Sequence, residues 1–214
     1  MSNLDKIVEN IPIDPGFMDM ERYYHSAVLV PVVSIGGKEH ILFEKRAMGI
    51  RQEGEVCFPG GGVDYGEDLY AAVIRECFEE LGILKENIEI IKQLPKILNP
   101  MAGAYVEPVL GRIRNYSESH LKINISEVSK VFTVPLEYFI NNPPEVYYVS
   151  TLSSPFEEHD DSDKIIFPAK ELNLPKIYHN RWAVRKHKVF VWKTDEVIWG
   201  LTAKIIKRLV EYFR

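Results

Sequence analysis

The chain has 214 residues and a formal net charge of −5, with 46% hydrophobic and 27% charged residues, as expected for an ordinary globular protein. This length suffices to bury a core, and the acidic balance argues against a broad surface for nucleic acids or anionic membranes. The two cysteines lack metal-ligand spacing, so neither a disulfide framework nor a structural zinc is expected. The N-terminus is polar and no apolar run is long enough to span a membrane, which predicts a cytoplasmic protein.

Residues 1–25 are predicted to form a polar lead-in, and residues 26–214 are predicted to form one domain. The valine-rich run at 27–33 predicts a buried strand. Gly36-Gly37 predicts a hairpin turn into a returning strand at 40–45. The glycine-containing stretch 46–61 is typical of a loop.

The next segment, 68–81, has the apolar spacing of a helix. Ile74, Cys77, Phe78 and Leu81 recur three and four residues apart, which predicts one buried stripe, and Gly82 is placed to cap the end. A short helical turn is expected at 135–140 and a helix at 197–213. Further strands are expected at 88–91, 106–113, 128–134, 146–151 and 189–192.

Three carboxylates crowd one side of this helix, because Glu76, Glu79 and Glu80 lie three and four residues apart. Each like-charge pair costs an isolated helix roughly 0.2–0.5 kcal/mol. A hard cation such as Mg²⁺ or Mn²⁺ would reverse that balance, since it is held by a few carboxylates, waters and substrate phosphates. Arg75 is spaced to pair with Glu79. The alternative is a solvated acidic face.

Residues 61–83 follow the pattern G-x5-E-x7-R-E-U-x-E-E-x-G-U, where U is bulky and apolar, and thereby resemble the Nudix hydrolase family. The resemblance implies an α/β (α+β) fold with a mixed β-sheet sandwiched between α-helices. It implies a divalent metal, Mg²⁺ or Mn²⁺, held by Glu76, Glu79, Glu80 and the backbone of Gly61. The implied catalytic set is Arg75, Glu79 and Glu80, with Glu67 as structural support.

The loop upstream contains two arginines suited to binding phosphate, although loop arginines are often merely solvated. It is similar to the signature L-L-T-x-R-[SA]-x3-R-x3-G-x3-F-P-G-G of the coenzyme A pyrophosphatase subfamily. Two departures are a missing residue between Arg51 and Gly54 and Leu42-Phe43-Glu44 in place of Leu-Leu-Thr. The implied reaction splits coenzyme A or acyl-coenzyme A into 3′,5′-ADP and (acyl-)4′-phosphopantetheine. The implied substrate-binding residues are Arg46, Arg51, Gly54, Phe58, Pro59 and Gly60.

Several alternatives stay open at this point. The general base is Glu79, Glu80 or a carboxylate of the acidic loop 155–163, which is otherwise an exposed turn. The basic segment 181–188 either approaches the 3′-phosphate of the substrate or is an exposed strand edge. Rival functions are a Nudix enzyme for ADP-ribose or an oxidised nucleotide, and a catalytically silent nucleotide-binding module. The expected assembly is a homodimer.

Overall fold

The computed structural model describes residues 3–10, 18–100, 102–157, 164–182 and 184–213. The chain divides into two compact units, Met1–Glu137 and Tyr138–Arg214. Among the described residues, no helix combines the length and the apolar character needed to cross a bilayer. The extent of the predicted single domain stays a prediction.

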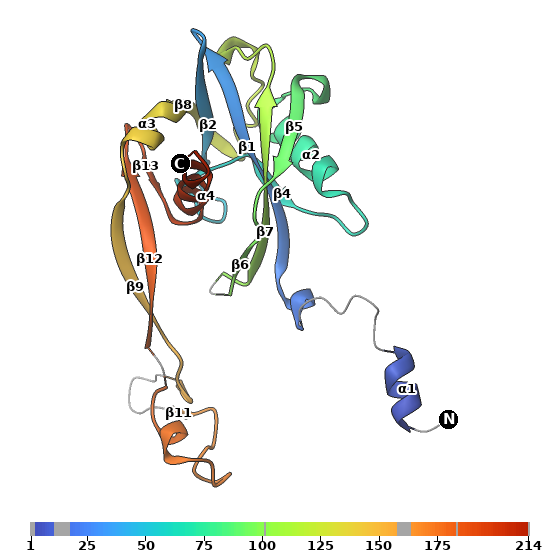
Figure 1. Cartoon of the computed structure of the whole chain (residues 1–214), viewed down its shortest axis with the longest axis vertical. Coiled ribbons are helices and arrows are strands. Elements are labelled where there is room, and N and C mark those ends of the chain that lie inside the picture. Colours follow the sequence, from blue (N-terminus) through green and yellow to red (C-terminus); the bar gives the residue numbers. More distant parts are fainter. Residues whose placement is uncertain (1–2, 11–17, 101, 158–163, 183, 214) are drawn as a thin grey trace. The chain divides into compact units, whose positions relative to one another are not determined.

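The first unit is built on a mixed sheet in the order β3-β2-β1-β7-β5 (Figure 1). Strands β1 and β7 run parallel, whereas the remaining pairs are antiparallel; β4 pairs with β1, β6 with β7 and β8 with β2. The bounds are β1 Tyr24–Ile35, β2 Lys38–Arg46, β3 Val56–Cys57, β4 Gly60–Gly62, β5 Ile88–Gln93, β6 Ile97–Asn99, β7 Ala104–Ile113 and β8 Val128–Pro135. The expected α+β class with a mixed sheet is confirmed.

Helix α2, Leu69–Leu81, lies where the sequence predicts it. The side chain of Asp68 caps its start by accepting from the backbone N–H groups of Tyr70 and Ala71 at 3.0 and 3.3 Å. Gly82 ends it in the left-handed conformation, with φ at 68°. One expectation is wrong: Phe78 is 55% exposed, because the stripe that packs on the sheet consists of Ala72, Val73, Cys77 and Leu81.

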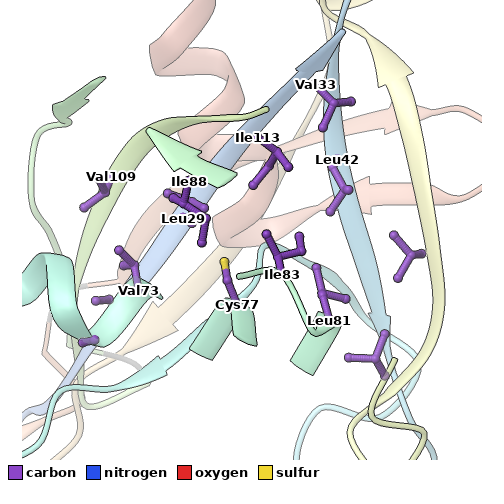
Figure 2. Close-up of a cluster of buried hydrophobic side chains, with 14 residues drawn as sticks. Leu29, Val33, Leu42, Val73, Cys77, Leu81, Ile83, Ile88, Val109 and Ile113 are labelled. Atoms are coloured by element: carbon purple, nitrogen blue, oxygen red, sulfur yellow. The ribbon is translucent and has the colours of Figure 1, made fainter. Parts of the chain in front are cut away.

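The core of the first unit lies between α2 and the sheet (Figure 2). Apolar side chains from β1, β2 and β7, including Leu29, Leu42 and Val109, meet Val73 and Cys77 of the helix. This packing fixes the rotation of α2 about its own axis. The rotation in turn decides which of its glutamates are covered.

Among the residues that the structure describes, the remaining helices are α1 Asn3–Asn10, α3 Leu136–Asn141 and α4 Gly200–Glu211. Short 3₁₀ turns occupy Met20–Arg22, Lys85–Asn87, Glu118–His120 and Lys176–His179. The second unit contains the antiparallel strands β9 Glu145–Leu152, β12 Val184–Lys193 and β13 Val197–Trp199, and the small pair β10 Phe156–Glu157 and β11 Lys164–Ile165 (Figure 1).

Three local expectations need correction. The predicted loop 46–61 contains β3 and the start of β4, because residues 56–57 pair with β2 and the glycines of β4 pair with β1 despite their low strand propensity. Strand β12 begins five residues before 189, since β9 provides partners for that whole length. The C-terminal helix begins at Gly200 because residues 197–199 pair with β12 instead.

Candidate active site

The site is built where the glycine strand β4 meets α2. The backbone N–H of Gly60 donates to Glu80 Oε2 at 2.9 Å, which holds the carboxylate against the strand. Gly60 has φ at 150°, and a Cβ added there would lie 2.6 Å from the Val28 Cα of the neighbouring strand. Only glycine allows this close approach, so Gly60 lets β4 lie against β1 at this point.

Gly61 leaves room for the carboxyl group of Glu76. A Cβ added to Gly61 would lie 2.7 Å from the carboxyl carbon of Glu76 and 2.8 Å from its Oε2. Ordinary carbon contacts are about 3.5–4.0 Å, so any side chain would displace the carboxylate. The backbone of Gly61 and the Glu76 carboxylate thus face each other, as the predicted metal site requires.

Arg75 holds the outer carboxylates together. Its Nε and Nη2 donate to the two oxygens of Glu67, each at 2.9 Å, and Nη2 also donates to the Gly62 carbonyl at 2.9 Å. Its Nη1 donates to Glu76 at 2.8 Å and to Glu79 at 3.1 Å. The predicted pairing of Arg75 with Glu79 is confirmed, and Glu67 supports the site by orienting this guanidinium.

The predicted metal ligands occupy different environments. Glu80 is 3% exposed, whereas the Glu79 side chain is 50% exposed. Burial, opposed in part by the Arg75 hydrogen bond, raises the pKa of Glu76. For Glu80, burial and then the negative charge of Glu44 raise the pKa to about 9. Burial therefore favours the protonated form of Glu80, and a cation bound beside it would favour the ionised form.

Two acidic residues that the sequence patterns do not single out act on this site. Glu44 of β2 is 1% exposed, and burial raises its pKa to about 7. Glu127, just before β8, adds its negative charge to the field at Glu44, Glu76 and Glu80. The available signal for Glu44 was a lone carboxylate ending the apolar run Ile41-Leu42-Phe43.

The upstream loop is anchored mainly through its own backbone. Arg46 Nε donates to the Arg51 carbonyl at 2.8 Å, and the Gly54 N–H, at a residue with φ of 73°, donates to the Arg46 carbonyl at 3.2 Å. Phe58 is 3% exposed and stacks on Phe43, and Pro59 is buried. The structure shows Phe58 and Pro59 packed in the protein interior. Substrate contacts stay predictions for these two and for Arg46, the exposed Arg51, Gly54 and Gly60.

The remaining candidates are described only in part by the structure. Residues 158–163 of the acidic loop and residue 183 are outside the described residues, while Glu157 lies in β10 and is exposed. Residues 184–188 are exposed in β12, where they pair with β9, and both predictions for the basic segment 181–188 stay open. Among the described histidines, His25 Nε2 lies at hydrogen-bond distance, 2.9 Å, from Glu107 Oε1.

The donor set fits a hard divalent cation. Within the described part of the chain, no three His, Cys, Asp or Glu side chains form a ready-made metal cage. Mg²⁺ does not require one, because it retains waters and binds substrate phosphates with one or two carboxylates. The space at Gly61 and the buried, unpartnered Oε2 of Glu44 are the two observations that match such an ion.

Comparison with known proteins places this site in a family. Residues 23–182 match the model of the NUDIX domain. The chain is 38% identical to Nudix hydrolase 3 of Caenorhabditis elegans, over 84% of this chain and 69% of that protein. It is 38% identical to the peroxisomal coenzyme A diphosphatase NUDT7 of Mus musculus, over 59% of this chain and 55% of that protein.

Similarity also extends to solved structures and to bacterial proteins. An Ap4A hydrolase from C. elegans, in a binary complex, is 26% identical with a TM-score of 0.45, over 54% of this chain and 83% of that one. A Nudix hydrolase NudL of Photorhabdus laumondii is 29% identical over 87% of this chain and 83% of that protein. With the NUDIX model covering most of the chain and the box residues gathered at one site, the chain belongs to the Nudix hydrolase family.

Proposed function

We propose that this chain hydrolyses the diphosphate bond of coenzyme A or acyl-coenzyme A, with Mg²⁺ or Mn²⁺ as cofactor. The products would be 3′,5′-ADP and (acyl-)4′-phosphopantetheine. The observation that supports the hydrolytic part is the position of Glu80 and Glu76 beside Gly60 and Gly61, with Arg75 joining Glu76 to Glu79 and offsetting only part of the negative charge of these carboxylates. A divalent cation and a diphosphate together complete that balance.

Each residue has a distinct task in the proposed reaction. A bound cation would neutralise charge on the diphosphate and lower the pKa of a water. Arg75 fixes the rotamers of Glu76 and Glu79, so little reorganisation is needed when substrate arrives. Glu80 is held by Gly60. The base that takes the water's proton stays open between Glu79, Glu80 and the acidic loop 155–163.

The choice of coenzyme A rests on two lines of support. The loop with Arg46 and Arg51 is similar to the subfamily signature, and guanidinium groups suit phosphate recognition. A relative that is 38% identical over 59% of this chain is named a coenzyme A diphosphatase. The proposed setting is the cytoplasm, consistent with free Cys57 and Cys77, and the proposed assembly is a homodimer.

A substrate panel tests this proposal. Coenzyme A, an acyl-coenzyme A, ADP-ribose and an oxidised nucleotide are incubated with Mg²⁺ or Mn²⁺, and release of 4′-phosphopantetheine or the matching product is measured. We expect the coenzyme A substrates to turn over fastest. Strong preference for ADP-ribose or the nucleotide would reject the substrate assignment while leaving the hydrolytic one intact.

Glu80→Gln separates catalysis from silent nucleotide binding. Its burial and raised pKa mean that a neutral amide resembles the metal-free state, so the fold should persist while turnover falls by orders of magnitude. Glu86→Gln, an exposed glutamate in the turn after the helix, is the matched control and should retain activity. Equal turnover by Glu80→Gln and wild type would favour the silent module.

A further inference from the structure

Glu44 is a carboxylate placed inside an apolar strand. It is 1% exposed in β2, where its direct neighbours are Cys57 on β3 and Val131 on β8. Alternate residues of a strand share a face, so Glu44 points to the same side as Leu42. Figure 2 shows Leu42 in the cluster that contains Leu81 and Ile83 of the helix region. Glu44 therefore projects toward α2, where Glu80 precedes Leu81.

The hydrogen bonding of Glu44 is incomplete. Its Oε1 accepts from the Cys57 thiol at 3.3 Å, and its Oε2 is buried with no hydrogen-bond partner. A thiol is a weak donor, and an unpaired buried carboxylate is costly in free energy. Arg46 offsets part of the charge electrostatically, but its Nε is used by the Arg51 carbonyl. A cation or another positively charged partner beside Glu44 Oε2 would supply the interaction that this oxygen lacks.

The buried carboxyl group of Glu80 also has few hydrogen-bond partners. It is 3% exposed, it accepts one backbone hydrogen bond from Gly60, and its negative charge and that of Glu44 repel each other. The hydrogen bonds of Arg75 go to Glu67, Glu76, Glu79 and the Gly62 carbonyl. The guanidinium thus serves the outer carboxylates. Ionisation of both members of this inner pair, Glu44 and Glu80, would place two negative charges together, and Glu44 Oε2 has no hydrogen-bond partner.

We propose that Glu44, on strand β2, is a further ligand for a divalent cation, which it binds together with Glu80 of helix α2. The proposal rests on the metal dependence proposed above and adds a residue from outside the box. An ion of this kind is compatible with two carboxylates, the remainder of its coordination being water and phosphate oxygens. Threonine occupies this position in the signature that the loop resembles, so the extra carboxylate distinguishes this chain from that pattern.

Mn²⁺ binding in the absence of any substrate tests the assignment. Wild type, Glu44→Gln and the control Glu86→Gln are titrated with Mn²⁺, following free Mn²⁺ by electron paramagnetic resonance and the melting temperature in parallel. Glu44→Gln should bind Mn²⁺ about tenfold or more weakly and show a smaller melting-temperature rise with Mn²⁺. Without metal, it should melt at the wild-type temperature or above, because an unpaired buried charge is gone. Glu86→Gln should match wild type in both respects.

Glu44→Asp covers the case in which the amide variant does not fold. It keeps the charge but shortens the reach by one methylene, and we again expect weaker Mn²⁺ binding. A folded Glu44→Gln or Glu44→Asp with wild-type Mn²⁺ affinity would overturn the inference, and would indicate that the pair holds a proton instead. Failure of wild type itself to bind Mn²⁺ would overturn the proposed metal dependence as well, whereas the substrate panel tests the coenzyme A assignment separately.

Discussion

Replacing Gly61 with alanine tests the geometry of the site at a single atom. Gly61 does not have a positive φ, so its backbone tolerates alanine. The added Cβ would lie 2.7 Å from the carboxyl carbon of Glu76, against an ordinary contact of about 3.5 Å or more. The carboxyl group must therefore retreat by roughly 1 Å.

That displacement has a predictable cost. Glu76 accepts from Arg75 at 2.8 Å, and a retreat of this size weakens or breaks the bond. A misplacement of about 1 Å in a positioned group lowers the rate by on the order of 10²-fold. We expect kcat with Mg²⁺ to fall by about that factor, while the melting temperature changes little because only one part-exposed hydrogen bond is affected.

Gly62→Ala is the matched control. It lies next in the same strand, and its Cβ would meet the Tyr24 hydroxyl at 2.5 Å, the mobile end of a side chain that is 58% exposed. Tyr24 can rotate away, so kcat should stay within about twofold of wild type. Steady-state kinetics and thermal melting on the three proteins decide the matter. Wild-type kcat in Gly61→Ala, or an equal loss in both variants, would refute the reasoning.

Three further predictions concern Arg75, the cap of α2 and the two buried carboxyl groups. Arg75→Lys replaces the guanidinium, which donates to several acceptors, with a single ammonium group, so activity should fall about 10–100-fold in kinetic assays. An unchanged rate would contradict the orienting role of Arg75. Asp68→Ala removes the cap of α2 and should lower the free energy of unfolding by about 1 kcal/mol in urea melts without abolishing activity; no loss would disprove the cap. Because the folded-state pKa values of Glu44 and Glu80 are raised to about 7 and about 9, the folded protein holds more protons than the unfolded chain above pH 4.5. The metal-free protein should therefore lose stability from about pH 5 to pH 9, with Mg²⁺ reversing the loss, and denaturation melts showing rising stability over that range would contradict the buried-charge account.

Several features follow from the sequence alone. The spacing of Cys77 and Leu81 and the stop at Gly82 predict α2 almost to the residue, because helix periodicity and C-terminal capping are local properties. The box pattern gives the family and the pairing of Arg75 with Glu79, which lie one helical turn apart. These predictions need no knowledge of distant parts of the chain.

Other features depend on the tertiary structure. The sequence places Glu76, Glu79 and Glu80 on one side of a helix, but packing of α2 on the sheet covers Glu80, leaves Glu79 half exposed and turns Phe78 outward. The contribution of Glu44 depends on β2 pairing with β1, with β3 and with β8, the last of which is distant in the sequence. Helical spacing is set within one turn, whereas burial and the field between carboxylates are set by segments more than thirty residues apart.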